Sequence, residues 1–146
     1  MPVPQDILPT LNEAQVRIVK RSTPPEFVKQ RMGRGGLTLD YVEVGYVVDQ
    51  LNEAFNFMWD FEIEGEKVGT TQVWVKGKLR VHVSPDVSIV KTAFGGADIK
   101  KSRETGDVID IADDLKAASA DALKKAASLL GIAADVYYPN LRNGGK

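Results

Sequence analysis

Residues 59–94 read WDFEIEGEKVGTTQVWVKGKLRVHVSPDVSIVKTAF, and this stretch decides the fold. Apolar and polar residues alternate along most of it, which is typical of strands that bury one face and expose the other. Turn-forming residues divide it near Glu66–Thr70 and at Ser84-Pro85-Asp86. We therefore predict three consecutive antiparallel strands, of which the third runs over Val87–Phe94 and ends at Gly95-Gly96.

Helical patterns precede the strands. Residues 11–19 predict a short helix, and Thr23-Pro24-Pro25-Glu26 predicts the start of a second one. In that second helix Thr23 suits the N-cap, Pro24 suits the first helical position, and Glu26 completes a capping box. We expect it to stop at Gly33, before a loop at Arg34-Gly35-Gly36.

A third helix is predicted after Asp40 and Glu43, which form another capping box. Its apolar face has spacings of three and four residues and comprises Val44, Val47, Val48, Leu51 and Phe55. The opposite side carries Tyr46, Asp49 and Glu53.

A final amphipathic helix is predicted over residues 111–130. Its core face comprises Leu115, Ser119, Ala122, Ala126 and Leu129. Lys124 and Ser128 fall on the opposite side. The order of the elements predicts an α+β fold, in which a three-stranded antiparallel β-meander packs on helices as a β-β-β-α core.

The length of 146 residues fits one domain. We predict an N-terminal arm and short helix at 1–23, a core domain at 24–134 and a C-terminal tail at 135–146. The first ten residues hold three of the seven prolines, which favours an extended arm.

Composition excludes several classes of protein. The chain has no cysteine and one histidine, His82, which removes disulfides, zinc fingers, cysteine nucleophiles and histidine-rich metal sites. No apolar run is long enough to span a membrane, and the N-terminus has no signal-peptide pattern. We expect a protein of a reducing cytoplasm, without cofactor or metal.

Catalytic motifs find little support in the sequence. Residues 95–102, GGADIKKS, come nearest to a phosphate-binding loop, but they lack the second glycine and the spacing of G-x-x-x-x-G-K-[ST]. Asp113 and Asp114 could hold a metal, yet adjacent carboxylates at a helix start more often offset the helix dipole. We therefore expect that the protein is not an enzyme.

Charges are segregated in blocks, although the net charge is only −1. Residues 17–34 carry six cations against one acid, residues 40–66 carry eight acids and no base, and residues 104–114 carry five acids and no base. The blocks favour either pairing within or between subunits, or contact with a charged partner.

One candidate nucleic-acid-binding row lies on the polar face of the second strand and comprises Trp74, Lys76, Lys78, Arg80 and His82. Aromatic and cationic side chains in one row suit a single strand, because bases stack on aromatics while cations follow phosphates. However, Asp60, Glu62 and Glu64 of the preceding strand share that face. Cross-strand ion pairs are the favoured interpretation of Lys76 and Lys78.

Two other groups of cations are candidates. Lys100, Lys101 and Arg103 follow the third strand, and Lys124-Lys125 lie on the last helix. Lys124 sits near the centre of the polar helix face, and Lys125 follows Asp121 by one turn, which allows an ordinary ion pair. A charged helix face is also often simply solvated, so both interpretations of these lysines stay open.

Several motifs then occur in the order found in one known family. They comprise Pro25-Glu26-Phe27-Val28, Arg31-Met32, Gly35-Gly36, Tyr41-Val42-Glu43, Leu51-Asn52-Glu53-Ala54-Phe55, Trp59, Val73–Val83, Phe94-Gly95-Gly96, and Asp121-Ala122-Leu123-Lys124-Lys125-Ala126 ahead of Leu130-Gly131. In these motifs, which span about residues 24–134, the chain resembles the Rad52-like recombination proteins and their phage relatives of the Sak type.

The resemblance implies a β-β-β-α core that assembles side by side into homo-oligomeric rings, with single-stranded DNA in a groove around the outside. It implies ATP-independent annealing of complementary strands, and it places Lys124 and Lys125 in the groove. A further basic residue of eukaryotic members matches Ser128. A family arginine matches roughly Tyr46, which could stack or hydrogen-bond but could not neutralise a phosphate.

The chain lacks the long C-terminal extension that recruits other recombination proteins in eukaryotic members. The resemblance therefore favours a phage or prophage protein in a bacterial cytoplasm, with other recombination or replication proteins as further partners. Two alternatives stay open: a DNA-end protection protein on the same fold without productive annealing, and a purely structural ring-forming protein.

Overall fold

The computed structural model describes residues 11–142, and the predicted arm at residues 1–10 lies outside them. In chain order the helices and strands are α1 (Glu13–Val19), β1 (Lys29–Met32), β2 (Thr38–Tyr41), α2 (Val44–Phe55), β3 (Trp59–Val68), β4 (Gln72–Ser84), β5 (Val87–Asp98), α3 (Ile111–Ser128), α4 (Ala134–Tyr137) and α5 (Pro139–Arg142). None of the described helices has the length and apolar character needed to cross a membrane.

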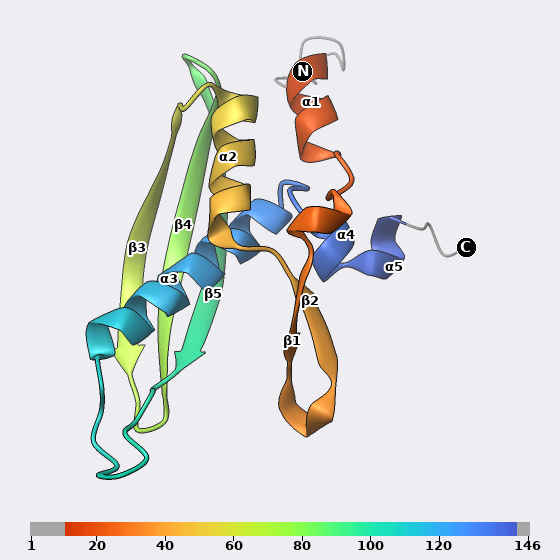
Figure 1. Ribbon diagram of the computed structural model, residues 1–146. Coiled ribbons are helices and arrows are strands. Elements are labelled where there is room, and N and C mark those ends of the chain that lie inside the picture. Colours follow the sequence, from red (N-terminus) through yellow and green to blue (C-terminus); the bar gives the residue numbers. More distant parts are fainter. Residues whose placement is uncertain (1–10, 143–146) are drawn as a thin grey trace.

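Strands β3, β4 and β5 form the predicted three-stranded antiparallel sheet, in that order across it (Figure 1). The alternation along β4 has the expected result, because Val73, Val75, Leu79 and Val81 are all fully buried. These four side chains share one face, so that face of the sheet carries the core. The helices pack on it, and the predicted α+β class is confirmed.

Helix α3 crosses the buried face of the sheet diagonally (Figure 1). Ala118 and Ala122 of this helix are fully buried against β4. The approach is closest at Gly95, where a β-carbon would meet the backbone of both alanines. At Gly77 a β-carbon would meet the Phe61 ring and, at 3.2 Å, the methyl group of Ala122. Small residues on both sides therefore let the helix lie directly on the strand backbone.

The core continues between α2, the C-terminal half of β4 and the second half of α3. Its buried members include Val42, Val47, Leu51, Phe55, Leu79, Val81, Leu123, Ala126, Ala127 and Ile132. The predicted short helix at 11–19 is also present as α1, which begins with a reciprocal capping box between Asn12 and Gln15. The helix predicted at 11–19 is thus confirmed as α1, and the helix predicted after Glu43 is confirmed as α2.

The predicted helix beginning at Thr23-Pro24-Pro25-Glu26 is wrong. The backbone nitrogen and the hydroxyl of Thr23 both donate to the carboxylate of Asp135 at 2.8 Å, so Thr23 does not cap a helix. Pro24 is extended, with ψ 140°, because a residue that precedes a proline is disfavoured in the helical region. Only a single 3-10 turn forms, at Pro25–Phe27, and the chain continues as β1.

Strands β1 and β2 pair into an antiparallel hairpin that projects away from the sheet (Figure 1). Its turn is the loop predicted at Arg34-Gly35-Gly36, where both glycines have positive φ, 72° and 77°. Only glycine adopts this region without cost. Asp40 lies in β2 and accepts a hydrogen bond from the Gln30 amide at 3.1 Å. The predicted Asp40–Glu43 capping box is therefore wrong, although α2 begins after Glu43 as expected.

Strand β5 runs on to Asp98, so the prediction that Gly95-Gly96 ends the third strand is wrong. The backbone nitrogen of Gly96 donates to the Asp121 carboxylate of α3 at 3.0 Å. The two glycines therefore mark a close approach of the helix rather than a turn.

Side-chain bonds connect the segments predicted as arm, core and tail. Thr23 bonds to Asp135 as described, and the hydroxyl of Tyr137 accepts a hydrogen bond from the backbone nitrogen of Val42 at 3.3 Å. These bonds fix α4 to the chain on either side of the hairpin. Tyr137 thereby positions the end of β2 relative to the C-terminal helices.

We expect Gly95→Ala to lower the free energy of unfolding by roughly 1–3 kcal/mol or more, the usual cost of overpacking a core, because the new methyl group meets the α3 backbone. Gly96→Ala is the matched control, since its β-carbon would lie 3.4 Å from the Val73 carbonyl oxygen, an ordinary contact. Urea unfolding measures both variants. Equal free energies of unfolding for Gly95→Ala and Gly96→Ala would show that α3 does not rest on Gly95.

Candidate nucleic-acid interface

Lys124 lies in the second half of α3 and links this helix to the hairpin. Its ammonium nitrogen is 5.4 Å from the centroid of the Tyr41 ring at the end of β2. Such an ammonium is attracted by the face of the ring, typically by about 0.5–2 kcal/mol. The side chain is half-buried between the two elements. It thus lies at an interface between helix and hairpin, not on the outer helix face that the sequence predicted.

Charged neighbours act on Lys124 from both elements. Burial lowers the pKa of Lys124 below its ordinary value of 10.5, Asp121 raises it, and Arg31 of β1 and Lys125 lower it further. Glu43 adds a smaller attraction. The fold therefore brings three cations and two carboxylates to this point and partly strips Lys124 of water.

We name Arg31, Tyr41, Lys124 and Lys125 the cation–tyrosine cluster. The sequence predicted Lys124 and Lys125 but not Arg31 or Tyr41, because the hairpin that brings them to α3 was not predicted. The sequence did contain a signal for Arg31 and Tyr41, because they stand inside the motifs Arg31-Met32 and Tyr41-Val42-Glu43 that carry the family resemblance.

Lys125 forms the predicted ion pair one turn along the helix. Its ammonium nitrogen lies 3.0 Å from the carboxylate of Asp121. The same carboxylate accepts the bond from Gly96, so Asp121 is shared between α3 and β5. An exposed pair of this kind contributes roughly 0.3–0.5 kcal/mol. Lys125 is exposed, so this weak pair leaves its charge open to a stronger anion.

Beside Lys125 the surface has a hollow of about 320 Å³, which we name the aromatic hollow. It lies between β5, α3 and α4 and is lined by Ala93, Phe94, Lys125, Ser128, Leu129, Tyr137 and Tyr138. Leu129 was predicted to face the core, but 48 % of it is exposed. The hollow therefore combines one cation with an apolar, largely aromatic lining.

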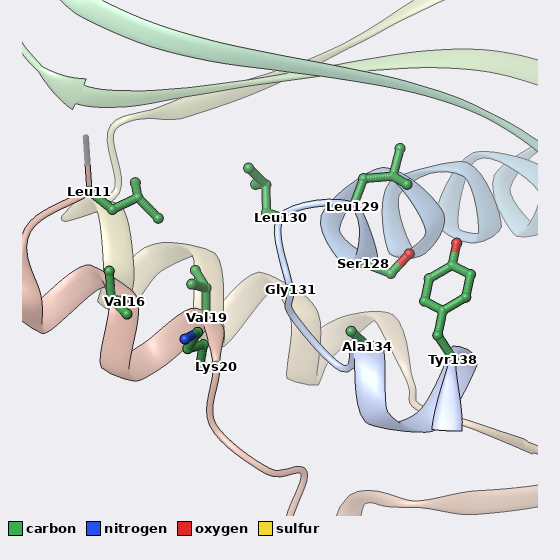
Figure 2. A pocket seen from close by; sticks show the side chains of 10 residues that line it. All are labelled: Leu11, Val16, Val19, Lys20, Ser128, Leu129, Leu130, Gly131, Ala134 and Tyr138. Carbon is green, nitrogen blue, oxygen red and sulfur yellow. The ribbon is translucent and has the colours of Figure 1, made fainter. Parts of the chain in front are cut away.

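A second hollow of about 420 Å³ adjoins the first, and we name it the apolar hollow. Figure 2 shows Leu11, Val16 and Val19 of the N-terminal segment on one side, and Leu130 and Ala134 on the other. Its remaining lining residues are Lys20, Ser128, Leu129, Gly131 and Tyr138. Three residues, Ser128, Leu129 and Tyr138, line both hollows.

The sequence predicted that Ser128 lies opposite the core, and this prediction is wrong. Ser128 is buried, and its hydroxyl donates to the Lys125 carbonyl oxygen at 2.6 Å. The position that the family resemblance matches to a basic residue thus carries a hydroxyl that is bonded within its own helix.

The polar face of β4 carries the predicted ion pairs. Lys76 and Lys78 lie 4.0 Å and 3.9 Å from the two oxygens of Glu64, and Arg80 lies 3.4 Å from Asp60. The predicted cross-strand ion pairs of Lys76 and Lys78 are present, and the two lysines share the single carboxylate of Glu64. Trp74 on the same face makes an edge-to-face contact with Phe94 at 5.6 Å.

The third group of cations lies at the other end of α3. Lys100 contacts Asp113 at 3.3 Å and Asp114 at 3.5 Å, and the hydrogen bond to Asp113 is the main reason that its pKa is raised. Asp114 is only 1 % exposed, so of the two adjacent carboxylates at the start of α3 only Asp113 lies on the surface. Lys101 and Arg103 are exposed. Lys124 follows Asp113 by eleven positions along the helix, a rise of roughly 16 Å, so this group lies apart from the cluster.

Tyr46 does not lie on an exposed helix face. It is 9 % exposed, and its ring contacts Phe27 at 4.9 Å between centroids. A buried ring has no free face for a base, so its position gives no support to a role in stacking on DNA.

A three-stranded sheet with a helix resting on its backbone, and a basic hairpin held against that helix, defines an α+β domain with a localised cationic surface. A sequence model of the Rad52/22 family double-strand break repair proteins matches residues 11–140. The chain belongs to this family of DNA repair and recombination proteins. A comparison with curated protein sequences finds no match.

We expect an NMR titration of the Lys124 side chain to give a midpoint below 10.5, with the resonance assigned by its loss in Lys124→Arg. A DNA phosphate bound at Lys124 would raise the midpoint, because it favours the charged form. Between the lowered pKa and 10.5 the unfolded chain holds more protons than the folded one, so the contribution of Lys124 to stability rises with pH in that window. A midpoint of 10.5 would mean that the ammonium is solvated, and one above 10.5 would mean that Asp121 and Glu43 outweigh burial; either result would contradict the half-buried cluster.

Proposed function

We propose that this protein binds single-stranded DNA and anneals complementary strands without ATP. The observation that carries the proposal is the cation–tyrosine cluster, in which the hairpin and α3 bring together two lysines, an arginine and a tyrosine in a member of a double-strand break repair family. Cations bind phosphates, and an aromatic ring accepts a base or a sugar, so the set fits a single strand.

The proposed mechanism is non-catalytic. Arg31, Lys124 and Lys125 contact the phosphate backbone, which binds a strand without reading its sequence. Neutralised phosphates repel a second strand less, and bases that remain unpaired are open to a complementary strand. The protein acts as a scaffold on which pairing occurs, and the energy of pairing replaces that of a nucleotide cofactor.

We further propose that the protein forms a homo-oligomer, in the ring arrangement that the family resemblance implies. Within residues 11–142, β3 and β5 are the edge strands of the sheet, and an edge strand readily pairs with another chain. The hairpin exposes Met32, Leu37 and Leu39, an apolar surface that a neighbouring subunit would cover. A ring aligns the clusters of successive subunits, so one strand of DNA can contact many of them.

The resemblance to Sak-type proteins supports a setting in phage DNA recombination in a bacterial cytoplasm, with other recombination or replication proteins as partners. Lys100, Lys101 and Arg103 are candidates for a second, separate DNA contact, since Lys101 and Arg103 are exposed. The alternative functions differ in one respect: an end-protection protein binds DNA but does not speed annealing, and a structural ring does neither.

We expect the double variant Lys124→Ala, Lys125→Ala to weaken single-strand binding and to slow annealing while the fold survives, since alanine is the better helix former. Loss of two phosphate contacts should make the slope of log affinity against log salt shallower by roughly 1.4. A fluorescence titration across salt concentrations and an annealing assay on complementary oligonucleotides measure this.

The control is Lys116→Ala, an exposed lysine on the first half of the same helix, which should change neither property. Binding and annealing equal to wild type in the double variant would place the groove elsewhere. Normal binding with no annealing by the wild type would favour the end-protection alternative.

We expect light scattering to give a mass several times the 16.0 kDa of one chain at micromolar concentration. The exposed hairpin apolar groups and the open sheet edges are the physical reason. Leu37→Glu tests the contribution of the hairpin, because a carboxylate at an interface would have to be desolvated and should reduce the mass. A stable monomer in the wild type, with and without DNA, would rule out the ring.

A further inference from the structure

Asp121 is a carboxylate that the fold holds in place beside the cation–tyrosine cluster. The helix that carries it rests on the strand backbone through Ala118 and Ala122. Its carboxylate accepts a hydrogen bond from the backbone nitrogen of Gly96 at 3.0 Å, and only 28 % of its side chain is exposed. The position of this negative charge is therefore fixed by both the helix and the strand.

The cation paired with Asp121 has no comparable anchor. The ammonium nitrogen of Lys125 lies 3.0 Å from the same carboxylate oxygen that accepts the Gly96 bond, and 51 % of the lysine side chain is exposed. Among the residues that the structure describes, Asp121 is the one ion-pair partner of Lys125. Lys125 can turn away by rotation about its side-chain bonds, whereas Asp121 would lose Gly96 if it moved. Any exchange of partners at this pair is therefore made by the lysine.

Asp121 also acts on the second lysine of the cluster. It is the strongest attraction on the Lys124 ammonium group, ahead of Glu43, and it opposes the effects of burial and of Arg31 on the pKa of Lys124. One carboxylate thus supplies counter-charge to both lysines of α3 in the free protein. A phosphate of a bound strand would supply the same kind of charge to the same two ammonium groups, at a point where like charges repel.

We propose that Asp121 is a built-in competitor of the DNA phosphates, which holds Lys125 in the free protein and lowers the affinity of the cation–tyrosine cluster for a single strand. This inference rests on the proposed function and adds to it a residue that sets how long a strand stays bound. The fixed carboxylate favours departure of the phosphate, and Lys125 returns to Asp121 when the strand leaves. Complementary strands must leave the protein once they have paired, so this release serves annealing.

A purely structural role is the competing explanation, since Asp121 also bonds α3 to Gly96. Asp121→Asn separates the two roles, because the amide oxygen still accepts from Gly96 while the negative charge is lost. Asp121→Ala removes both the charge and the bond. Asp86→Asn is the matched control for net charge, because it removes an exposed carboxylate at the opposite end of β5 from Gly96.

The test is a fluorescence titration of the full chain with a labelled oligothymidylate, followed by stopped-flow measurement of its dissociation. We expect Asp121→Asn to bind about twofold more tightly or more, the factor that corresponds to an ion pair of this kind, and to release the strand correspondingly more slowly. Asp86→Asn should match the wild type. The gain should shrink in a Lys125→Ala background, because the lysine for which the two anions compete is then absent.

A second measurement needs no DNA. The NMR midpoint of the Lys124 side chain should fall further in Asp121→Asn than in the wild type, because Asp121 raises the pKa of Lys124. A residue that only bonds the helix to the strand would leave this midpoint unchanged in the asparagine variant. An unchanged midpoint would therefore overturn the inference.

The outcomes of the titration separate the two proposals. If the wild type does not bind the strand, the proposed function fails and the competition fails with it. If the wild type binds but Asp121→Asn binds equally or more weakly, single-strand binding stands and the competition is wrong. Weaker binding by both Asp121→Asn and Asp121→Ala would assign Asp121 to the positioning of Lys125. An equal gain in Asp86→Asn would assign the effect to net charge and would also overturn the inference.

Discussion

The contact of α3 with the backbone of β4 and β5 is the constraint on which the other features depend. Ala118 and Ala122 can reach the strands only because Gly95 and Gly77 carry no side chain there. This close approach fixes the height and the direction of the helix over the sheet. Asp121 reinforces it by accepting from Gly96, and the hydrophobic contacts of Leu123 and Ala126 continue the packing toward α2. A helix held at any greater distance would leave a void that large residues alone would have to fill.

The position of the candidate site follows from the same contact. Once Ala122 and Ala126 face the sheet, Lys124 is turned sideways, neither into the core nor fully into water. It then meets the end of β2, where Tyr41 is held next to Val42, and Val42 in turn is fixed by the hydroxyl of Tyr137. The cluster is thus assembled from three separate segments, and rigid packing rather than loop chemistry sets its geometry. Such pre-organisation fits the proposed role of holding a strand in a defined path.

Sequence periodicity predicted the elements whose environment is uniform along their length. The alternation of β4 and the three- and four-residue spacing in α2 survive because one face of each is buried throughout. Predictions failed where a distant residue decides the outcome. Thr23 has the chemistry of a helix cap, but Asp135, far along the chain, takes both of its donors. Gly95-Gly96 has the appearance of a strand end, but the glycines exist for a helix that packs there. Neither partner is visible in a local window of sequence.

The candidate site divides in the same way, between residues that the sequence predicted and residues that it did not. The electrostatics of Lys124 also favour a binding function for the cluster. The order of the family motifs predicted Lys124 and Lys125, whereas Arg31 and Tyr41 depend on a hairpin that local patterns did not predict.

Placing Lys124 in a half-buried position beside two other cations disfavours its charged form, which is why its pKa is lowered. The ring of Tyr41 and the carboxylate of Asp121 offset this only in part. A lysine that served the fold alone would be better replaced by an apolar residue. A phosphate would add a counter-charge to those of Asp121 and Glu43, which is the contribution that the proposed binding of a single strand requires.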